Sequence, residues 1–252
     1  MTFSIERRPQ ELVFRRAVLR ERSTLAPGYH RLRFVGDDLK GFGPSGSDDH
    51  IRVFFPPLDA GELSDAELRA LPHRDYTPRA WDSDAGVLDL EFVVHGDEGV
   101  AGPWSQAATP GSLIALAGPR GSLAIVGQPD AWFLAGDESA IAQIGRYLQR
   151  AGENARGLLV IETSNCAHDV PLDVPAGFEV RRVHRDDQES LPAFLNTLTS
   201  DDRPQGELFA FVAAEQEVVT HARHLLHDRW GMSPDAAVIK GYWKHGSADD
   251  DE

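Results

Sequence analysis

The hydrophobic pattern of this chain changes once, near Gly118, and this change constrains the fold more than any other feature of the sequence. Before it, short apolar runs are separated by Gly/Pro turns, and several of them alternate polar and apolar residues as half-buried strands do. After it, continuous apolar runs alternate with segments of helical spacing, as in βα units around a parallel sheet. We therefore predict a small antiparallel barrel or sandwich, then an α/β domain, with the boundary within 118–130.

Both halves can be divided into elements by the same patterns. The first half has strand candidates at 12–14 with 18–19, 29–35, 50–55, 73–77, 87–94 and 112–117. It also has one candidate for a short surface helix, within 59–71. The second half has strands at 131–135, 157–161, 178–183, 208–213 and 238–243, with helices at 138–150, 191–198 and 218–226.

Composition excludes several classes of protein. The net charge of −15 argues against nucleic acid or an anionic membrane as the main partner. A single cysteine, Cys166, rules out an internal disulfide framework and fits a reducing cytoplasm. No run approaches the roughly 20 apolar residues of a membrane span, and the first ten residues lack the apolar core of a signal peptide. The acidic run 249–252 is expected to be a solvated tail.

The segment 73–79, HRDYTPR, is the first candidate ligand site. In an extended segment Arg74 and Tyr76 share one face, because side chains alternate with a period of two. Such a face offers a flat π-surface and a fixed cation to one ligand. The alternative is that both are ordinary sheet residues.

The segment 95–105, HGDEGVAGPWS, is the second. Its glycines leave the backbone uncovered, and Pro103 suits the first turn of a short helix at 103–109. A helix start with exposed N–H groups binds anions, and a pyrophosphate would fit there. The alternative is a glycine-rich loop that simply joins a strand to a helix.

Two βα junctions of the second half form a third candidate. Gly136 to Ala140 follows one strand and 213–215 follows another, so both lie at the carboxyl edge of the sheet, where ligands of doubly wound folds bind. The segment is not a GxGxxG fingerprint, and Asp137 is also expected to cap a helix. The end segment 240–246, KGYWKHG, has the character of a lid, a surface anchor or an ordinary end strand.

Two further features are set aside. His221, His224 and His227 are spaced along a helix, but no carboxylate or cysteine accompanies them, so a polar helix face is favoured over a metal site and no metal is predicted. Cys166 has no histidine in a nucleophile motif and is expected to be structural.

Seven pieces in order resemble the siderophore-interacting protein family, the flavin-dependent ferric-siderophore reductases. They are 49–56 (DHIRVFFP), 74–79 (RDYTPR), 92–96 (FVVHG), 99–104 (GVAGPW), 117–121 (AGPRG), 134–140 (LAGDESA) and 241–246 (GYWKHG). Three positions depart from the family pattern: Ala214 stands for the glycine of Ala-Gly-Glu, Ser139 for a threonine, and Arg182 for the tryptophan before Val-His-Arg.

The resemblance implies an FAD-binding antiparallel β-barrel at 11–122, a doubly wound parallel-sheet NAD(P)H-binding domain at 130–246 and an acidic tail at 247–252. Hydride would pass from NADH or NADPH to FAD, and single electrons to the Fe(III) of a ferric siderophore. Arg74 would meet a cofactor phosphate, Tyr76 would pack on the isoalloxazine and Thr77 would bond its edge. The remaining FAD contacts are expected at Val94, His95, Gly99, Val100, Ala101, Gly102 and Trp104.

The same resemblance places the nicotinamide nucleotide at Gly136, Asp137, Glu138, Ser139, Glu162 and Glu215, with Glu215 nearest the nicotinamide. Glu162 would suit a ribose diol and repel a 2′-phosphate, whereas Arg181, Arg182 and Arg185 could offset that, so the choice between NADH and NADPH stays open.

An anionic ferric siderophore needs local cations on so acidic a protein. The candidates are Arg52, Arg120, Lys240 and Lys244, of which Arg52, Arg120 and Lys244 are hypothesised to converge above the flavin edge. We expect a cytoplasmic monomer. The alternatives are another ferredoxin-reductase-like flavoenzyme, a reductase supplied by an electron-donor protein, and a siderophore-binding module without catalysis.

Overall fold

The computed structural model describes residues 2–44, 46–94 and 99–245, which divide into two compact units. Residues 6–124 form a β unit, and residues 125–245 form an α/β unit that also includes residues 2–5. Within these described ranges no helix is long and apolar enough to cross a membrane. Each unit has its own sheet and its own apolar core.

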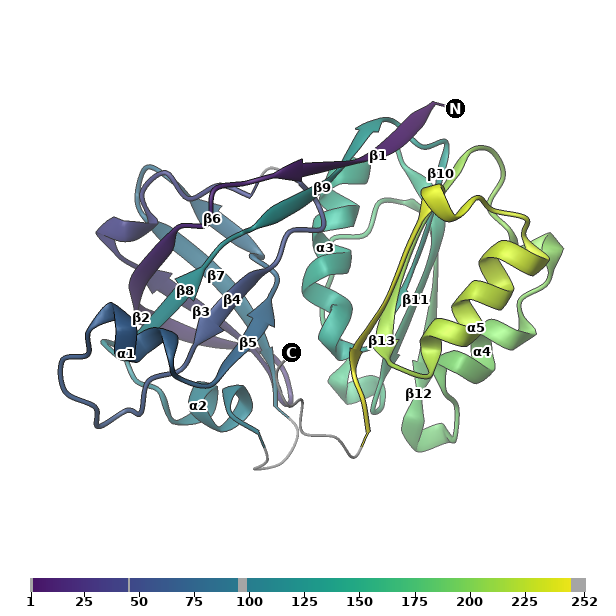
Figure 1. Cartoon of the computed structure of the whole chain (residues 1–252). Coiled ribbons are helices and arrows are strands. Elements are labelled where there is room, and N and C mark those ends of the chain that lie inside the picture. Colours follow the sequence, from purple (N-terminus) through teal and green to yellow (C-terminus); the bar gives the residue numbers. More distant parts are fainter. Residues whose placement is uncertain (1, 45, 95–98, 246–252) are drawn as a thin grey trace. The chain divides into compact units, whose positions relative to one another are not determined.

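The β unit is built on one seven-stranded sheet in which neighbouring strands run antiparallel, and the sheet curls around a core (Figure 1). Its strand order is β5-β4-β8-β2-β3-β7-β6. The elements are β2 (Phe14–Ala26), β3 (Tyr29–Val35), β4 (Ile51–Phe54), α1 (Asp65–Arg69), β5 (His73–Tyr76), β6 (Ala80–Asp82), β7 (Val87–Val93), α2 (Ala101–Ala107) and β8 (Leu113–Ala117).

Alternation explains which face of this sheet is buried. Leu32 and Phe34 of β3 lie in the core with Leu90 and Phe92 of β7, while the residues between them point to the other face. That other face carries paired charges: Arg33 contacts Asp89 through two bonds of 2.8 Å, directly across from it in the strand register. Cross-strand pairs of this kind fix the register of β3 against β7.

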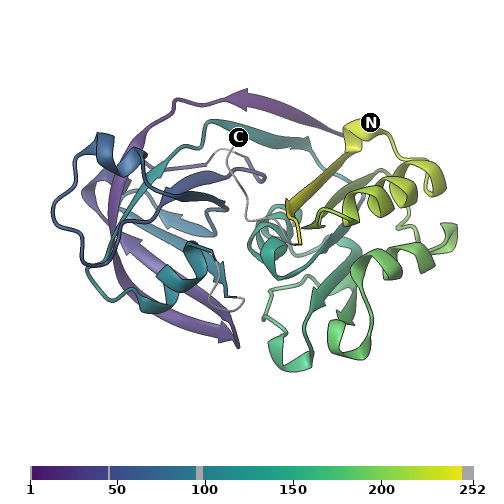
Figure 2. The same ribbon diagram turned by 60° about the horizontal axis from the view of Figure 1, so that its bottom comes forward.

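The α/β unit is a five-stranded parallel sheet of order β12-β11-β10-β13-β14. Helix α3 covers one face, and α4 and α5 cover the other (Figure 1 and Figure 2). The elements are β10 (Ala131–Gly136), α3 (Ile141–Ala151), β11 (Arg156–Thr163), β12 (Gly177–His184), α4 (Leu191–Thr197), β13 (Leu208–Glu215), α5 (Val218–Arg223) and β14 (Ala237–Trp243).

Strands buried on both faces read as continuous apolar runs, which is why β10 and β13 stand out in the sequence. At the end of β10 a side chain has no room. A Cβ on Gly136 would lie 2.5 Å from the Cβ of Ala140 and 2.7 Å from the carbonyl oxygen of Ala213. Glycine therefore lets the start of the helical segment sit directly on the sheet.

Helix α5 continues as a π-helical turn at His224–Arg229. The amide of Trp230 donates to the carbonyl of Leu225, five residues back, at 2.9 Å. The side chains that follow reach the end of α4: Arg229 donates to the carbonyl of Asn196 at 2.9 Å, and the Trp230 indole to that of Thr199 at 2.7 Å. The uniform α-helical spacing assumed from the sequence is therefore wrong beyond residue 223.

The predicted fold class is confirmed, and the structure adds three strands whose sequence patterns are weak. Phe14, the last residue of the run at 12–14, and the run at 18–19 belong to one long strand, β2, in which Arg15 and Arg16 interrupt the apolar signal; residues 12–13 precede the strand. Strands β1 (Phe3–Pro9) and β9 (Gly121–Gly127), which pair with each other, and the three-residue β6 were not predicted. β1 is mostly exposed and β6 is fully exposed, so neither has the apolar alternation that identifies a buried strand.

Candidate cofactor and nicotinamide sites

Strand β5 places Arg74 and Tyr76 on one face, as predicted. They lie opposite Val53 and Ile51 of β4, both core residues, so the pair faces inward. Asp75 between them points the other way and lies opposite Arg52, with 3.7 Å between carboxylate oxygen and guanidinium nitrogen.

The Tyr76 ring is half-buried and its ring centroid lies 4.5 Å from that of Phe92. Burial raises the pKa of its phenol, so the ring is neutral at physiological pH. The half-buried Arg74 guanidinium donates to the carbonyl of His73 at 2.7 Å and forms no ion pair with the residues that the structure describes. A half-buried cation without a counter-charge fits an anionic ligand group beside the ring.

Helix α2 begins at Ala101, two residues earlier than predicted, and its N-cap is Val100. Valine has no side-chain acceptor, so no side chain of the N-cap satisfies the first amides of this helix. Trp104, a predicted FAD contact, is buried in the core and donates its indole N–H to the carbonyl of Pro56 at 2.9 Å. His95 lies outside the described residues.

In the α/β unit, the strand order brings the two predicted junctions together. β10 and β13 are neighbours, and Gly136 is in register with Ala213. From β10 the chain first adds β11 and β12 on one side and then returns to add β13 on the other. The carboxyl ends of β10 and β13 therefore flank the topological switch point of the sheet, where a crevice for ligands forms in doubly wound folds.

Asp137 is the buried acid of this edge, with 3% of its surface exposed. One carboxylate oxygen accepts from the amide of Ser139 at 2.9 Å and from its hydroxyl, so the predicted capping role is present. The other accepts from the indole N–H of Trp243 at 2.7 Å. Burial raises the pKa of Asp137 to about 6, against these bonds, which lower it.

Glu138 and Glu162 share one cation, Arg185. One guanidinium nitrogen lies 2.9 Å from a Glu138 oxygen and 2.8 Å from a Glu162 oxygen. The second Glu162 oxygen accepts from the amide of Leu191 at the start of α4. Glu162 is 8% exposed and both its oxygens are engaged, so the contact to a ribose diol expected from the sequence would require one of these bonds to break.

The three arginines expected to attract a 2′-phosphate differ in their contacts. Arg181 is exposed and donates to Glu179 at 2.6 Å. Arg182 is half-buried with its Nε 3.8 Å from Asp169, and one of its terminal nitrogens is buried without a hydrogen-bond partner among the residues that the structure describes. Arg185 is held by the two glutamates. They do not form one cationic cluster.

Glu215, at the end of β13, accepts hydrogen bonds with both oxygens. The amide of Glu217 donates at 2.6 Å, and the amide of His245 donates at 3.1 Å. The four cations predicted to meet the substrate belong to different units: Arg52 and Arg120 are exposed in the β unit, whereas Lys240 is half-buried and Lys244 exposed at the end of the α/β unit.

The three histidines of the α5 segment have separate partners. His221 pairs with the side chain of Asn196, His224 with that of Asp228 and His227 with the carbonyl of Met232. No group of three or more metal-ligating side chains occurs in the described part of the chain. Cys166, expected to be structural, is exposed in a short 3-10 turn after β11.

Sequence comparison connects both units to one family. The model of the siderophore-interacting FAD-binding domain matches residues 18–123, and that of the siderophore-interacting protein matches residues 129–246. The ferric vibriobactin reductase ViuB of Vibrio cholerae is 30% identical over 228 residues, which are 86% of this chain and 84% of the relative. This chain belongs to the siderophore-interacting protein family.

Other family relatives match over similar lengths. The NADPH-dependent ferric-chelate reductase of Escherichia coli is 29% identical over 247 residues, covering 92% of this chain and 94% of the relative. The crystal structure of a siderophore utilization protein from T. fusca is 27% identical and superimposes with a TM-score of 0.86, over 98% of both chains.

The β unit of this siderophore-interacting protein carries groups that fit FAD. Arg74 supplies a cation that has no counter-charge among the described residues, Tyr76 supplies an aromatic face, and α2 starts with amides that its N-cap does not satisfy. Trp104 supports this region from within the core rather than from the surface.

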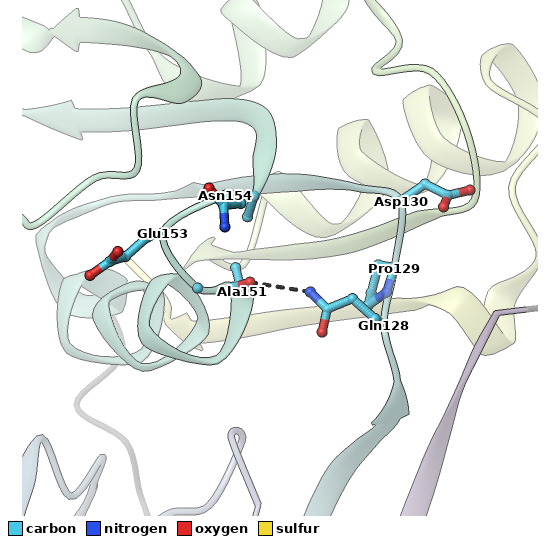
Figure 3. A pocket seen from close by; sticks show the side chains of 8 residues that line it. Gln128, Pro129, Asp130, Ala151, Glu153 and Asn154 are labelled. Carbon is cyan, nitrogen blue, oxygen red and sulfur yellow. Dashed lines mark hydrogen bonds between the residues drawn. The ribbon is translucent and has the colours of Figure 1, made fainter.

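A hollow lies in the α/β unit. It encloses about 280 Å³ next to Gln128, at the amino ends of β10 and β11, and the Gln128 amide donates across it to the carbonyl of Ala151 at 3.2 Å (Figure 3). Ligands of doubly wound sheets bind at the opposite, carboxyl edge, so we assign no role in the nicotinamide site to this hollow.

Sequence reasoning missed two contacts of the carboxyl edge: the indole of Trp243 on Asp137, and the pair of glutamates on Arg185. Trp243 was noticed as an aromatic between lysines, but its partner is 106 residues away. No spacing rule connects residues that far apart.

Proposed function

We propose that this protein reduces ferric siderophores to release Fe(II), with electrons taken from NAD(P)H through FAD. The observation that carries this function is the match of both units, in order, to the two domains of one family. The curated relatives that span this chain almost end to end are named a ferric vibriobactin reductase and an NADPH-dependent ferric-chelate reductase.

The division of labour follows from the chemistry. Bound FAD supplies the conversion of a two-electron hydride donor into a source of single electrons for Fe(III). The protein holds and orients the reactants: Arg74 and Tyr76 bind the flavin nucleotide, and the crevice between the ends of β10 and β13 receives the nicotinamide. Asp137, Ser139 and Glu215 border that crevice. Oxygen chelators hold Fe(III) far better than Fe(II), so reduction releases the iron.

The iron chelate meets the cations of the protein. With a net charge of −15, long-range attraction of an anionic siderophore is weak, so local positive groups must hold it. Arg52 is only loosely paired, 3.7 Å from Asp75, which leaves its charge able to contribute. Exposed charges act over about 8 Å at physiological ionic strength, so this contribution is salt-sensitive. We assign the contacts to Arg52, Arg120, Lys240 and Lys244.

The reaction places the protein in the cytoplasm, where reduced nicotinamide nucleotides are available, and a monomer suffices for it. The acidic charge is unsuited to a nucleic-acid partner. Size-exclusion chromatography with light scattering tests the monomer directly.

Anaerobic titration tests the proposed function. The purified, flavin-loaded protein is mixed with NADPH or NADH, and flavin absorbance is followed; bleaching by at least one nucleotide is expected. Ferric chelates are then added without oxygen. Return of the oxidised flavin spectrum together with Fe(II) capture by a ferrous indicator supports the function. A flavin that bleaches but is reoxidised by no ferric chelate contradicts it.

A further inference from the structure

The last strand of the α/β unit contains a β-bulge that redirects its end. β14 runs in register with β13 up to the pair Gly241–Ala214, but the next pair is Trp243 with Glu215. Tyr242 is thus the extra residue of β14 at the point where the register shifts. Bulges bend a strand and re-aim the side chain that follows, which here is Trp243. The amide of Gln216 fixes the new direction by donating to the carbonyl of Trp243 at 2.8 Å.

From this position the Trp243 indole crosses the end of β13. The order β10-β13-β14 puts β14 two strand spacings, about 10 Å, from β10. Even so, the indole nitrogen lies 2.7 Å from the carboxylate of Asp137, the first residue after β10. The side chain therefore spans the carboxyl end of β13, at the topological switch point of the sheet, where doubly wound folds bind their ligands.

The indole is held there by a polar contact more than by packing. Its residue is 40% exposed, among the most exposed large apolar residues described in this chain. Asp137, by contrast, is 3% exposed, and Ser139 fixes its other oxygen. Among the described residues the indole is the donor to the remaining oxygen. A buried carboxylate oxygen that loses its donor is costly, so the indole can leave readily only if another N–H takes its place.

Nicotinamide carries such a donor, since its carboxamide has two N–H bonds. We propose that Trp243 is a displaceable occupant of the nicotinamide crevice, and that Asp137 exchanges the indole N–H for the carboxamide N–H of the incoming nucleotide. This inference rests on the proposed function, because it needs a nicotinamide nucleotide as the donor. In this proposal Asp137 determines specificity by accepting a hydrogen bond from the nicotinamide carboxamide. The indole of Trp243 competes with that carboxamide for the same carboxylate oxygen.

The exchange has a measurable cost. A nucleotide that binds only after the occupant has left has a raised apparent dissociation constant, equal to the intrinsic constant divided by the fraction of protein in the open state. The substitution W243F keeps an aromatic ring but removes the N–H, and W243A removes the occupant. If the closed state outnumbers the open one by about ten to one, both variants bind NAD⁺ or NADP⁺ about tenfold more tightly than the parent. W81F is the matched control, because Trp81 is similarly exposed, at 36%, but belongs to the β unit.

Calorimetric titration of the flavin-loaded protein with the oxidised nucleotides measures this without turnover. The 3-acetylpyridine analogue, which has a methyl ketone in place of the carboxamide and so no N–H, should bind the parent at least about tenfold more weakly than the natural nucleotide. That comparison needs no variant and stands even if W243A folds poorly. In addition, acrylamide should quench the Trp243 emission, taken as the difference between parent and W243F, more strongly once nucleotide is bound.

The outcomes separate the two proposals. Unchanged or weaker nucleotide binding by both Trp243 variants, or equal binding of the acetylpyridine analogue by the parent, overturns the exchange while leaving the reductase function intact. A parent protein whose flavin is reduced by neither NADH nor NADPH, and which binds neither oxidised nucleotide, refutes the nicotinamide donor and the exchange together. Tighter binding by W81F as well would show that the effect is not local to the crevice.

Discussion

Replacement of Asp137 by asparagine tests the electrostatics of the carboxyl edge. The carboxyl is 3% exposed, and burial raises its pKa from 3.8 to about 6. An acid whose pKa is higher in the folded than in the unfolded protein binds its proton more tightly when folded. Its contribution to stability is therefore fully present below pH 3.8 and is lost as the pH rises to about 6.

The magnitude follows from the shift. A change of about two pKa units corresponds to about 3 kcal/mol of folding free energy. The bonds from Ser139 and Trp243 are already included in this net shift, because they oppose the effect of burial. Asparagine resembles the protonated carboxyl, with one carbonyl acceptor and no charge. Asp137→Asn should therefore unfold with a free energy up to about 3 kcal/mol higher than the parent at pH 8, and the difference should shrink to about zero near pH 4.

Urea unfolding at several pH values between 4 and 8 provides the assay, with the free energy extrapolated to zero denaturant for each protein. Asp173→Asn is a suitable control, since Asp173 is an exposed aspartate of the same unit. This control should leave the pH dependence of the parent unchanged. A stability difference between Asp137→Asn and the parent that is the same at every pH would refute the reasoning, because it would mean that the carboxyl titrates alike in folded and unfolded protein.

Three further predictions concern the proposed function. Arg74→Ala and Tyr76→Ala should each purify with less flavin, and loss of the charge-assisted bond of Arg74, about 1.5–3 kcal/mol, weakens FAD binding tenfold or more by fluorescence titration; full flavin occupancy in both variants would contradict the assignment. Glu215→Ala should slow flavin reduction by saturating NAD(P)H in stopped flow and leave the FAD content alone, so an unchanged rate would remove Glu215 from the site. A triple alanine variant should raise the KM for an anionic ferric siderophore, but much less for a neutral or cationic chelate, with flavin reduction intact; equal losses for all chelates, or none, would exclude these cations as substrate contacts. Its three positions are Arg52, Arg120 and Lys244.

Elements of the fold could be predicted wherever burial produces a recognisable pattern of apolar residues in the sequence. β3 and β10 were found to within one residue, because one alternates and the other is continuously apolar. The placement of Gly136 and Ala213 at one edge of the sheet also followed, since both end strands of one parallel sheet, whereas the adjacency of these two strands is seen only in the structure. The sequence could not predict which partners each polar group contacts. Glu162 lies where expected, yet its bonds to Arg185 and Leu191 depend on how a distant turn and helix pack.

The same limit applies to Arg74. Its face on β5 is fixed by alternation, but whether a carboxylate faces it depends on strand order. Here Asp75, the adjacent acid in the sequence, is turned to the opposite face and pairs with Arg52. Arg74 and Asp75, which are neighbours in the sequence, thus lie on opposite faces of the sheet. Only the three-dimensional arrangement shows that Arg74 is the one available to a ligand.

The π-helical turn at His224–Arg229 has an evolutionary meaning. A helix can accommodate the insertion of one residue without breaking if the extra residue forms a wider, π-helical turn. Deleting one residue there would restore an α-helix, but it would rotate everything downstream by about 100°. Arg229 and Trp230 would then turn away from the carbonyls of Asn196, in the last turn of α4, and Thr199, just after it, to which they now donate. Descendants of this chain can therefore lose that residue only together with a new way to end α4, and the insertion is locked in place by a neighbouring helix.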